Sequence, residues 1–131
     1  GGWSADESVQ LAIWLKAAGV DMVDVSSGGL VGGVRIPVGP GYQVPFAERI
    51  KRETGMLTMA VGLITEARQA EQILAEDKAD MIAGARVFLD DPHFGWHAAY
   101  KLGATPKVPP QYARATLKTW PPAAAAHTPK S

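Results

Sequence analysis

The fold is indicated by residues 20–29, which read Val-Asp-Met-Val-Asp-Val-Ser-Ser-Gly-Gly. The stretch 20–26 is short, rich in Val and bounded by Gly and Ser, a pattern that predicts a β-strand. Two later stretches share this character, the nearly continuous apolar run at 56–62 and the shorter run at 80–84. Strands that are apolar along their whole length are typical of a parallel sheet whose faces are covered by helices.

Helical patterns alternate with these three strands. Residues 4–18 have apolar residues at helical spacing, begin with the capping-box pair Ser4 and Glu7, and are followed by Gly19. Further helices are predicted over 45–54 between Pro45 and Gly55, over 66–76 behind a Thr65 cap, over the single turn 86–89, and over 93–102 before Gly103. A helix followed by three strand–helix pairs predicts an α/β chain.

Length and composition exclude several function classes. The chain has 131 residues, about one domain, and 47% of them are apolar, which fits a globular protein. Thirteen basic and thirteen acidic residues give a formal net charge of +0, which argues against a nucleic-acid partner. The chain has no Cys, so it holds no disulfide, thiolate metal site or Cys nucleophile, and three His are too few for a His-rich metal site. No run reaches the roughly 18 apolar residues of a membrane span, so we expect no membrane partner and a cytoplasmic location.

The beginning of the chain indicates part of a longer protein. It starts with Gly1 in place of Met, its first helix has no strand before it, and three strands are few for a parallel sheet. The chain is therefore processed, tagged or a fragment. The segment 105–131 has a different composition, rich in Pro and with four consecutive Ala, and we expect roughly its last ten residues to be disordered or dependent on a partner.

Ligand chemistry is expected where the strands end. In parallel α/β proteins, ligands meet the carboxyl ends of the strands, and the three ends here, at 26–29, 62–63 and 84–86, all carry Gly. Gly lets a backbone amide approach a ligand closely, a helix start favours an anion, and the Arg86 side chain suits phosphate. The alternative is that the glycines only form tight turns and that Arg86 pairs with a nearby carboxylate, Asp90 or Asp91.

Polar residues on and after the first strand are weaker candidates. Asp21 and Asp24 are three apart, so on a strand they face opposite sides and form no catalytic pair. For Asp24, tying down a neighbouring loop is the better interpretation. Ser26 and Ser27 could be nucleophiles, but no His–acid pair accompanies them, so capping a loop or touching phosphate is the better interpretation.

Two His residues and two arm residues complete the candidates. His93 and His97 have the spacing of two metal ligands on one helix face, but no Glu lies between them and no third ligand is evident. A surface or interface position is therefore the better interpretation, and no metal site is predicted. Tyr112 and Arg114 lie in a Pro-framed arm and are either ordinary surface residues or, if the arm docks on another subunit, interface anchors.

A combination of motifs resembles one known family. The motifs are residues 19–29, Pro-Gly-Tyr-Gln-Val-Pro-Phe-Ala at 40–47, Ala-Val-Gly-Leu-Ile-Thr at 60–65, residues 79–82, Ala85-Arg86 and Asp91-Pro92. Together they look like the C-terminal part of an old yellow enzyme, in the bacterial branch of NADPH dehydrogenases, ene-reductases and xenobiotic reductases. The resemblance covers about residues 2–115. It implies the last three β-α units of a (β/α)8 TIM barrel, with a partial barrel at 1–104 and a C-terminal arm and tail at 105–131.

The resemblance also implies a cofactor and an activity. The family reduces activated C=C bonds in small alkenes with FMN, using NADPH or NADH as reductant. On this chain the resemblance implies that the amides of Gly62 and Ala85 and the side chain of Arg86 hold the FMN phosphate, with Ser27 and Gly28 nearby. The family usually has Gly in place of Ala85, so this contact requires an ordinary φ at Ala85.

The C-terminal arm carries a further implied role. Gln-Tyr-Ala-Arg at 111–114 is similar to a family stretch whose Arg reaches the active site of a neighbouring subunit. This implies that role for Arg114 and a homo-oligomer formed through the arm. The family's substrate-binding His pair and proton-donating Tyr belong to earlier strands. His93, His97 and Tyr112 lack their motif context, so no catalytic residue is assigned to this chain.

Three hypotheses for the function remain open at this stage. The chain is the C-terminal portion of an FMN-dependent NAD(P)H oxidoreductase and is inactive alone. Alternatively, it is a non-catalytic phosphate-binding or assembly half-module, or an inactive gene remnant. A third hypothesis is another phosphate-binding barrel with a flavin or sugar-phosphate ligand, which fits the strand-end glycines but not the stretches 40–43 and 111–114.

Overall fold

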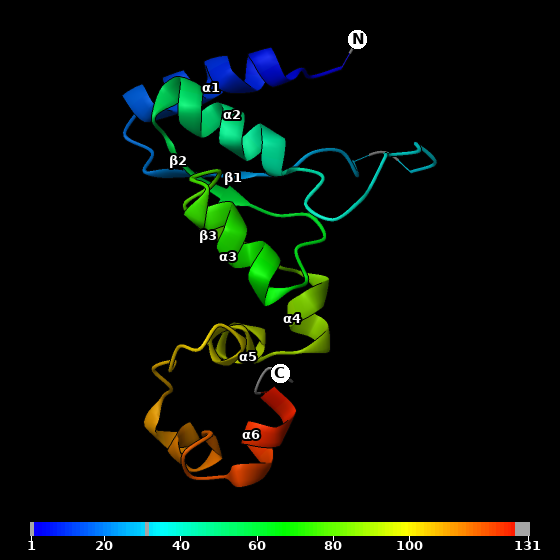
Figure 1. Cartoon of the computed structure of the whole chain (residues 1–131). Helices are drawn as coiled ribbons and strands as arrows, with labels where there is room; N and C mark the ends of the chain where they lie inside the picture. Colours follow the sequence, from blue (N-terminus) through cyan, green and yellow to red (C-terminus); the bar gives the residue numbers. More distant parts are fainter. Residues whose placement is uncertain (1, 31, 128–131) are drawn as a thin grey trace. The chain divides into compact units, whose positions relative to one another are not determined.

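The sheet consists of three short parallel strands (Figure 1). The structure is a computed structural model and describes residues 2–30 and 32–127. The strands are β1 (Met22–Val25), β2 (Leu57–Ala60) and β3 (Met81–Ile82). They lie in the order β1-β2-β3, and both neighbouring pairs are parallel. The prediction of an α/β chain with a parallel sheet is confirmed, and each strand is shorter than its predicted range.

The chain divides into two units. The first comprises Gly1–Thr65 and Gln69–Ala85, and the second comprises Glu66–Arg68 and Arg86–Ser131. The helices are α1 (Ala5–Ala17), α2 (Val44–Thr54), α3 (Ala67–Ala75), α4 (Arg86–Asp90), α5 (Phe94–Lys101), the 3-10 helix η1 (Pro110–Ala115) and α6 (Pro121–His127). In the described part of the chain, none of these helices is long and apolar enough to cross a membrane.

Helix α1 begins at the predicted capping box. The Glu7 amide donates to the Ser4 hydroxyl over 3.2 Å, and the Ser4 amide donates to the Glu7 carboxylate over 2.7 Å. The hydrogen bond from the Ser4 amide holds the pKa of Glu7 below its ordinary value, because it stabilises the ionised carboxylate. Gly19, with a φ of +89°, ends the helix in the left-handed conformation that the sequence indicated.

Helix α2 ends in a glycine that receives support from α1. Gly55 has a φ of +63°, and its amide donates to the carbonyl of Lys51 over 2.8 Å. The Lys16 ammonium donates to the carbonyls of Thr54 and Gly55, over 2.8 and 3.1 Å. A cation at a helix C-terminus is favourable, so Lys16 stabilises this end of α2 and its contact with α1.

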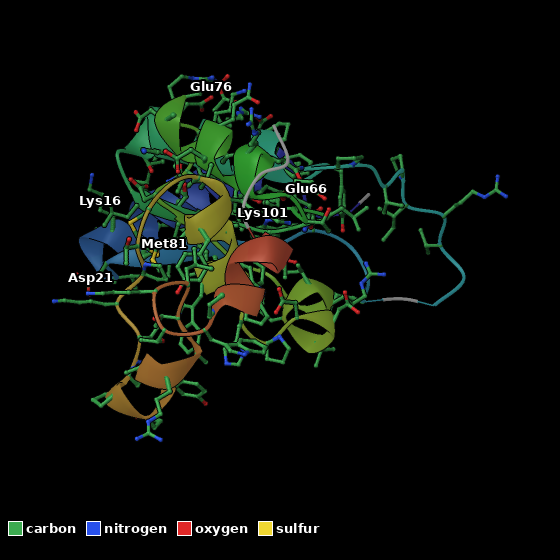
Figure 2. The ribbon with its side chains drawn as sticks, turned by 60° about the horizontal axis from the view of Figure 1, so that its bottom comes forward. Lys16, Asp21, Glu66, Glu76, Met81 and Lys101 are labelled. Atoms are coloured by element: carbon green, nitrogen blue, oxygen red, sulfur yellow. The ribbon has the colours of Figure 1, made fainter. Side chains whose placement is uncertain are left out.

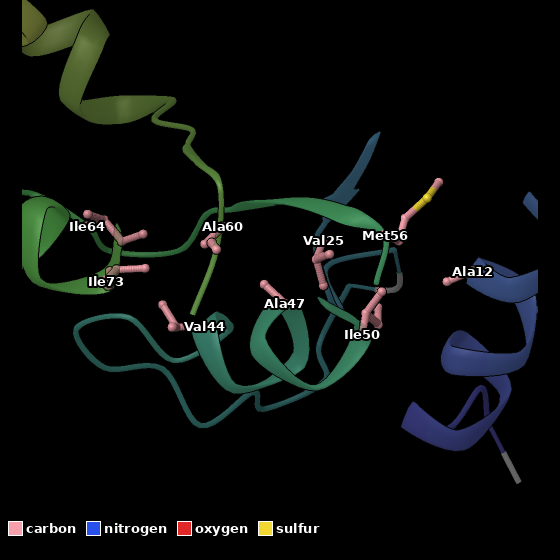
Figure 3. Close-up of a cluster of buried hydrophobic side chains, with 10 residues drawn as sticks. Ala12, Val25, Val44, Ala47, Ile50, Met56, Ala60, Ile64 and Ile73 are labelled. Atoms are coloured by element: carbon pink, nitrogen blue, oxygen red, sulfur yellow. The ribbon is translucent and has the colours of Figure 1, made fainter. Parts of the chain in front are cut away.

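The core of the first unit lies between the helices and one face of the sheet. Helices α1 and α2 run beside one another, and α2 also contacts β1 and β2 (Figure 1). Figure 3 shows side chains from both layers, among them Ala47 and Ile50 of α2 and Ala60 of β2. The cluster consists of Ala12, Val25, Val44, Ala47, Ile50, Met56, Ala60, Ile64, Ile73 and Ala79. Burial of this apolar surface is the main stabilising contribution to the unit.

The other face of the sheet is partly exposed and carries Asp24 of β1 together with apolar side chains. Ala60 lies in the core, so Leu57 and Met59 of the same strand point the other way. The register places Met81 beside Met59 on this face. Leu57 and Met81 are each 47% exposed, and Met81 is labelled in Figure 2. Because parallel sheets are ordinarily covered on both faces, this face is suited to a further apolar layer.

A charged network joins β2, β3 and α2 at the amino ends of the strands. The Thr58 amide donates to the Asp80 carboxylate over 2.9 Å, and Lys51 pairs with Asp80 at 2.9 Å and also with Asp77. Burial raises the pKa of Asp80, but the Thr58 amide and the Lys51 ammonium together outweigh burial and lower it below the ordinary value of 3.8. The hydrogen bonds that the Lys51 ammonium donates to the carboxylates of Asp77 and Asp80 raise the pKa of Lys51.

The C-terminal segment contains the short helix α6. The structure forms α6 over Pro121–His127, and the expectation that roughly the last ten residues are disordered or dependent on a partner stays a prediction. Proline is tolerated in the first turn of a helix and Ala has the highest helix propensity, so this local sequence favours a helix despite its low complexity. Residues 128–131 lie outside the described residues, and their disorder stays a prediction.

Candidate functional site

The carboxyl ends of β1 and β2 are joined by the side chain of Gln43. This residue lies in the turn before α2 and is only 3% exposed. Its Oε1 accepts hydrogen bonds from the Ser27 amide and, over 2.9 Å, from the Ser27 hydroxyl. Its Nε2 donates to the Val61 carbonyl over 3.2 Å. One buried amide therefore fixes the spacing of two strand ends.

Gly62 follows β2 in a conformation that requires glycine. Its φ is +115°, and a Cβ here would lie 2.8 Å from both Gln43 Nε2 and Tyr42 Cε1. The Gly62 carbonyl accepts from the Gly41 amide over 3.0 Å, which ties the turn before α2 to the end of β2. The next residue, Leu63, has a φ of +51°, so the backbone turns sharply here. The absence of a side chain at Gly62 lets the Gln43 and Tyr42 side chains pack directly against its backbone.

Ser27 and Gly28 lie at the end of β1. Both donors of Ser27 are used by Gln43, so its side chain anchors the strand end. Gly28 is exposed, with a φ of +70°, and a Cβ on it would meet the end of the Ile36 side chain at 2.7 Å. Both residues and Ser26 line a pocket of about 300 Å³ that is closed on its other sides mainly by α1 and α2. Sequence reasoning did not find the residues that α1 and α2 contribute to it.

Ala85 and Arg86 follow β3 and are consecutive in the chain. Among the described residues, the non-glycine residues with positive φ are Leu63 and Asp77, so Ala85 has an ordinary φ. An ordinary φ at Ala85 was the condition for its amide to contact the phosphate, and the backbone meets this condition. Arg86 is exposed and opens α4. Asp91, one of its alternative partners, contacts His97 Nδ1 at 2.5 Å.

The second unit holds an aromatic cluster around the C-terminal arm. The His93 ring stacks on Trp96 with centroids 4.4 Å apart. Tyr112 meets both rings edge-on, at 5.4 Å from His93 and 5.0 Å from Trp96. The arm is thus held at Tyr112 by packing on α5, and Arg114 lies exposed two residues later in η1.

Among the described residues, the other candidates from the sequence do not come together in a binding site. Asp21 and Asp24 are both exposed. His97 is engaged by Asp91, and His93 by its aromatic neighbours. In residues 2–30 and 32–127, no group of three or more His, Asp or Glu side chains is arranged to hold a metal ion.

The sequence matches a family profile over most of its length. The profile of the NADH:flavin oxidoreductase / NADH oxidase family matches residues 2–104, and the chain belongs to this family. FMN is the cofactor of the family. The resemblance to old yellow enzymes seen in the motifs is thereby confirmed.

Several bacterial proteins named NADPH dehydrogenase are similar to the chain. The identity is 50% over 115 residues for the protein from Listeria monocytogenes (strain EGD-e), 48% over 117 for that from Halalkalibacterium halodurans, and 51% over 107 for that from Bacillus pumilus. These alignments cover 88%, 89% and 82% of this chain, but 34%, 34% and 31% of the relatives. The chain therefore spans about a third of the length of the curated relatives it matches.

The strand ends fit the phosphate group of the family's cofactor. Gly62 has the positive φ of a sharp backbone turn at the strand end and no side chain of its own, and Ala85 has the ordinary φ that amide donation requires. Arg86 provides a permanent cation directly after Ala85 in the chain. Sequence reasoning missed Gln43, although it stands within the quoted motif 40–47. A polar residue in an otherwise apolar approach to a helix is the signal that could have found it.

Proposed function

We propose that the chain forms the last three β-α units of a (β/α)8 barrel in an FMN-dependent NAD(P)H oxidoreductase that reduces activated C=C bonds. Family membership supports the flavin chemistry. Three parallel strands in sequential order support the barrel. The exposed apolar face around Met59 and Met81 would point into the barrel, whose interior is filled by layers of side chains.

The observation that carries the proposal is the backbone at Gly62. A glycine with positive φ, packed so closely that a Cβ is excluded, lies at the end of a parallel strand. TIM barrels often bind phosphate in the loops after their seventh and eighth strands, which would correspond to β2 and β3. We assign the phosphate contacts to the amides of Gly62 and Ala85 and to the guanidinium of Arg86, with Ser27 and Gly28 at the neighbouring strand end.

This chain would contribute binding and orientation to the reaction. Bound FMN would supply hydride transfer from the reduced nicotinamide to the activated alkene. The amides and Arg86 would neutralise the phosphate and fix the cofactor by its phosphate end. No proton donor is assigned to the chain, because the resemblance gives that role to earlier strands. The names of the relatives favour NADPH as the reductant.

The arm residue Arg114 would act in a second subunit. Tyr112 is fixed on α5, and Arg114 projects from η1 as an exposed residue. We propose that this arm joins a homo-oligomer and places Arg114 at a neighbouring active site. The small activated alkene and the cytoplasmic location are further parts of the proposal.

The proposal can be tested by adding FMN to the purified 131-residue chain. Binding should perturb the flavin absorption bands and quench its emission, while alkene reduction with NADPH should be absent. An unchanged flavin spectrum with the chain in excess would count against the phosphate site. Alkene reduction by the chain alone would contradict the assignment of the catalytic residues to other strands. A longer product of the same gene that carries no flavin would refute the enzyme proposal.

A further inference from the structure

Gln43 binds the two strand ends in the same way. On β1 it holds Ser27, the residue directly before Gly28, and on β2 it holds Val61, the residue directly before Gly62. In both cases the bonded residue precedes a glycine with positive φ. The position of each glycine amide is therefore set by a contact one residue away.

The chemistry at position 43 requires a carboxamide. Gln43 accepts two hydrogen bonds through Oε1 and donates one through Nε2. Methionine has a similar length but offers neither an acceptor nor a donor of comparable strength, and an ionised Glu could accept from Ser27 but not donate to Val61. Since Gln43 is 3% exposed, water is poorly placed to replace a lost partner.

We propose that Gln43 is a positioning residue that holds Gly28 and Gly62 at the spacing that a phosphate group needs. The inference rests on the proposed function, because it takes the strand ends as the phosphate site. Gln43 would act through Ser27 and Val61, the residues that its carboxamide holds, and the proposal gives it no phosphate contact of its own. Gln43 would contribute to recognition of the phosphate. Its substitution should therefore lower the affinity for FMN and leave the affinity for riboflavin unchanged, because riboflavin has the same ring system without the phosphate.

Two substitutions separate geometry from charge. Gln43→Met keeps the length of the side chain and removes the hydrogen bonds. Gln43→Glu keeps the shape and the acceptor but adds a negative charge and loses the bond to Val61. Asp80→Asn is the matched control, because it weakens a partly buried hydrogen-bond network at the opposite, amino end of β2 and β3. It should lower stability without moving the strand ends near Gly62.

The experiment is a fluorescence titration of the full 131-residue chain and its variants with FMN and with riboflavin. We expect the wild type to prefer FMN, Gln43→Met to lose about tenfold in FMN affinity with riboflavin affinity unchanged, and Gln43→Glu to lose more. Asp80→Asn should keep the wild-type ratio of the two affinities. An unchanged ratio in both Gln43 variants would overturn the inference while leaving the proposed function intact. Equal binding of FMN and riboflavin by the wild type would overturn the phosphate site itself.

Removal of the Ser27 hydroxyl covers the case in which the Gln43 variants do not fold. Ser27→Ala deletes the hydrogen bond from the Ser27 hydroxyl to Gln43 Oε1 and keeps the one from the Ser27 backbone amide. It should lower the ratio of FMN to riboflavin affinity by a few-fold, and in the ¹H–¹⁵N spectrum it should shift the amide signal of Gly62 on the other strand. A wild-type ratio together with an unmoved Gly62 signal would overturn the inference.

Discussion

Met59 of β2 is the register partner of Met81 of β3, on the sheet face opposite the helical core. Both side chains are apolar, and Met81 is 47% exposed. Parallel sheets are ordinarily covered on both faces, so a face with exposed apolar side chains is incomplete as a layered structure. This relationship connects the short chain to the barrel proposed for the whole protein, because the same face would be the barrel interior.

Truncating a side chain should destabilise the chain less on the Met81 face of the sheet than in the core between the sheet and the helices. Met81→Ala should change the free energy of unfolding of the chain by less than about 1 kcal/mol, whereas Ile50→Ala, at a residue 4% exposed, should cost about 2–5 kcal/mol. Urea unfolding followed by circular dichroism measures both. Similar losses for the two variants would show that the Met81 face is already covered in the isolated chain.

Arg86→Ala should weaken FMN binding about ten- to a hundred-fold, because a charge-assisted hydrogen bond contributes about 1.5–3 kcal/mol. A flavin fluorescence titration measures the change. Arg52→Ala is a suitable control, since Arg52 is 66% exposed and bonds to Glu53 on the surface of α2. Equal FMN affinities for wild type and Arg86→Ala would remove Arg86 from the phosphate site.

Gly62→Ala tests the close packing at the end of β2. A Cβ at 2.8 Å from Gln43 and Tyr42, on a backbone with φ of +115°, should destabilise the chain by about 1–3 kcal/mol and reduce FMN affinity. Gly95→Ala in α5 is the matched control: apart from its chain neighbours and the backbone of its own helix, no atom lies within 4 Å of its Cβ position, and helix propensity predicts a gain of about 0.5–1 kcal/mol. Thermal unfolding compares them, and a wild-type midpoint for Gly62→Ala would refute the packing argument.

The network at Asp80 should make stability depend on pH at both extremes. The pKa of Asp80 is lowered from 3.8, so its contribution is complete above that pH and is lost as the pH falls through the folded pKa. The pKa of Lys51 is raised from 10.5, so its contribution is complete below that pH and is lost as the pH rises through the folded value. Asp80→Asn should flatten the acid limb of a plot of unfolding free energy against pH. An acid limb identical to that of the wild type would contradict this assignment.

Local signals in the sequence were sufficient for much of the fold. The Ser4–Glu7 capping box and the glycine end of α2 at Gly55 formed as predicted, because each depends on residues within one helical turn. The parallel sheet followed from three short strand patterns rich in apolar residues. The helix α6 was missed because Pro-rich composition was given more weight than the helix propensity of its alanines.

The candidate site was less accessible to sequence reasoning. Gln43 lies 16 residues from Ser27 and 18 from Val61, and no periodicity or capping rule connects side chains across such distances. Ser27 was expected near the phosphate, and the structure adds that its donors are directed to Gln43. The suitability of Ala85 depended on its φ, which only the backbone could supply.

The most direct test of the account is the ¹H–¹⁵N spectrum of the 131-residue chain during addition of FMN. Binding of the phosphate at the strand ends predicts that the amide signals of Gly28, Gly62, Ala85 and Arg86 shift together with one dissociation constant, while riboflavin leaves them in place. If FMN leaves these four signals unmoved, or if riboflavin shifts them equally, the strand ends do not form the phosphate site and the central claim is wrong.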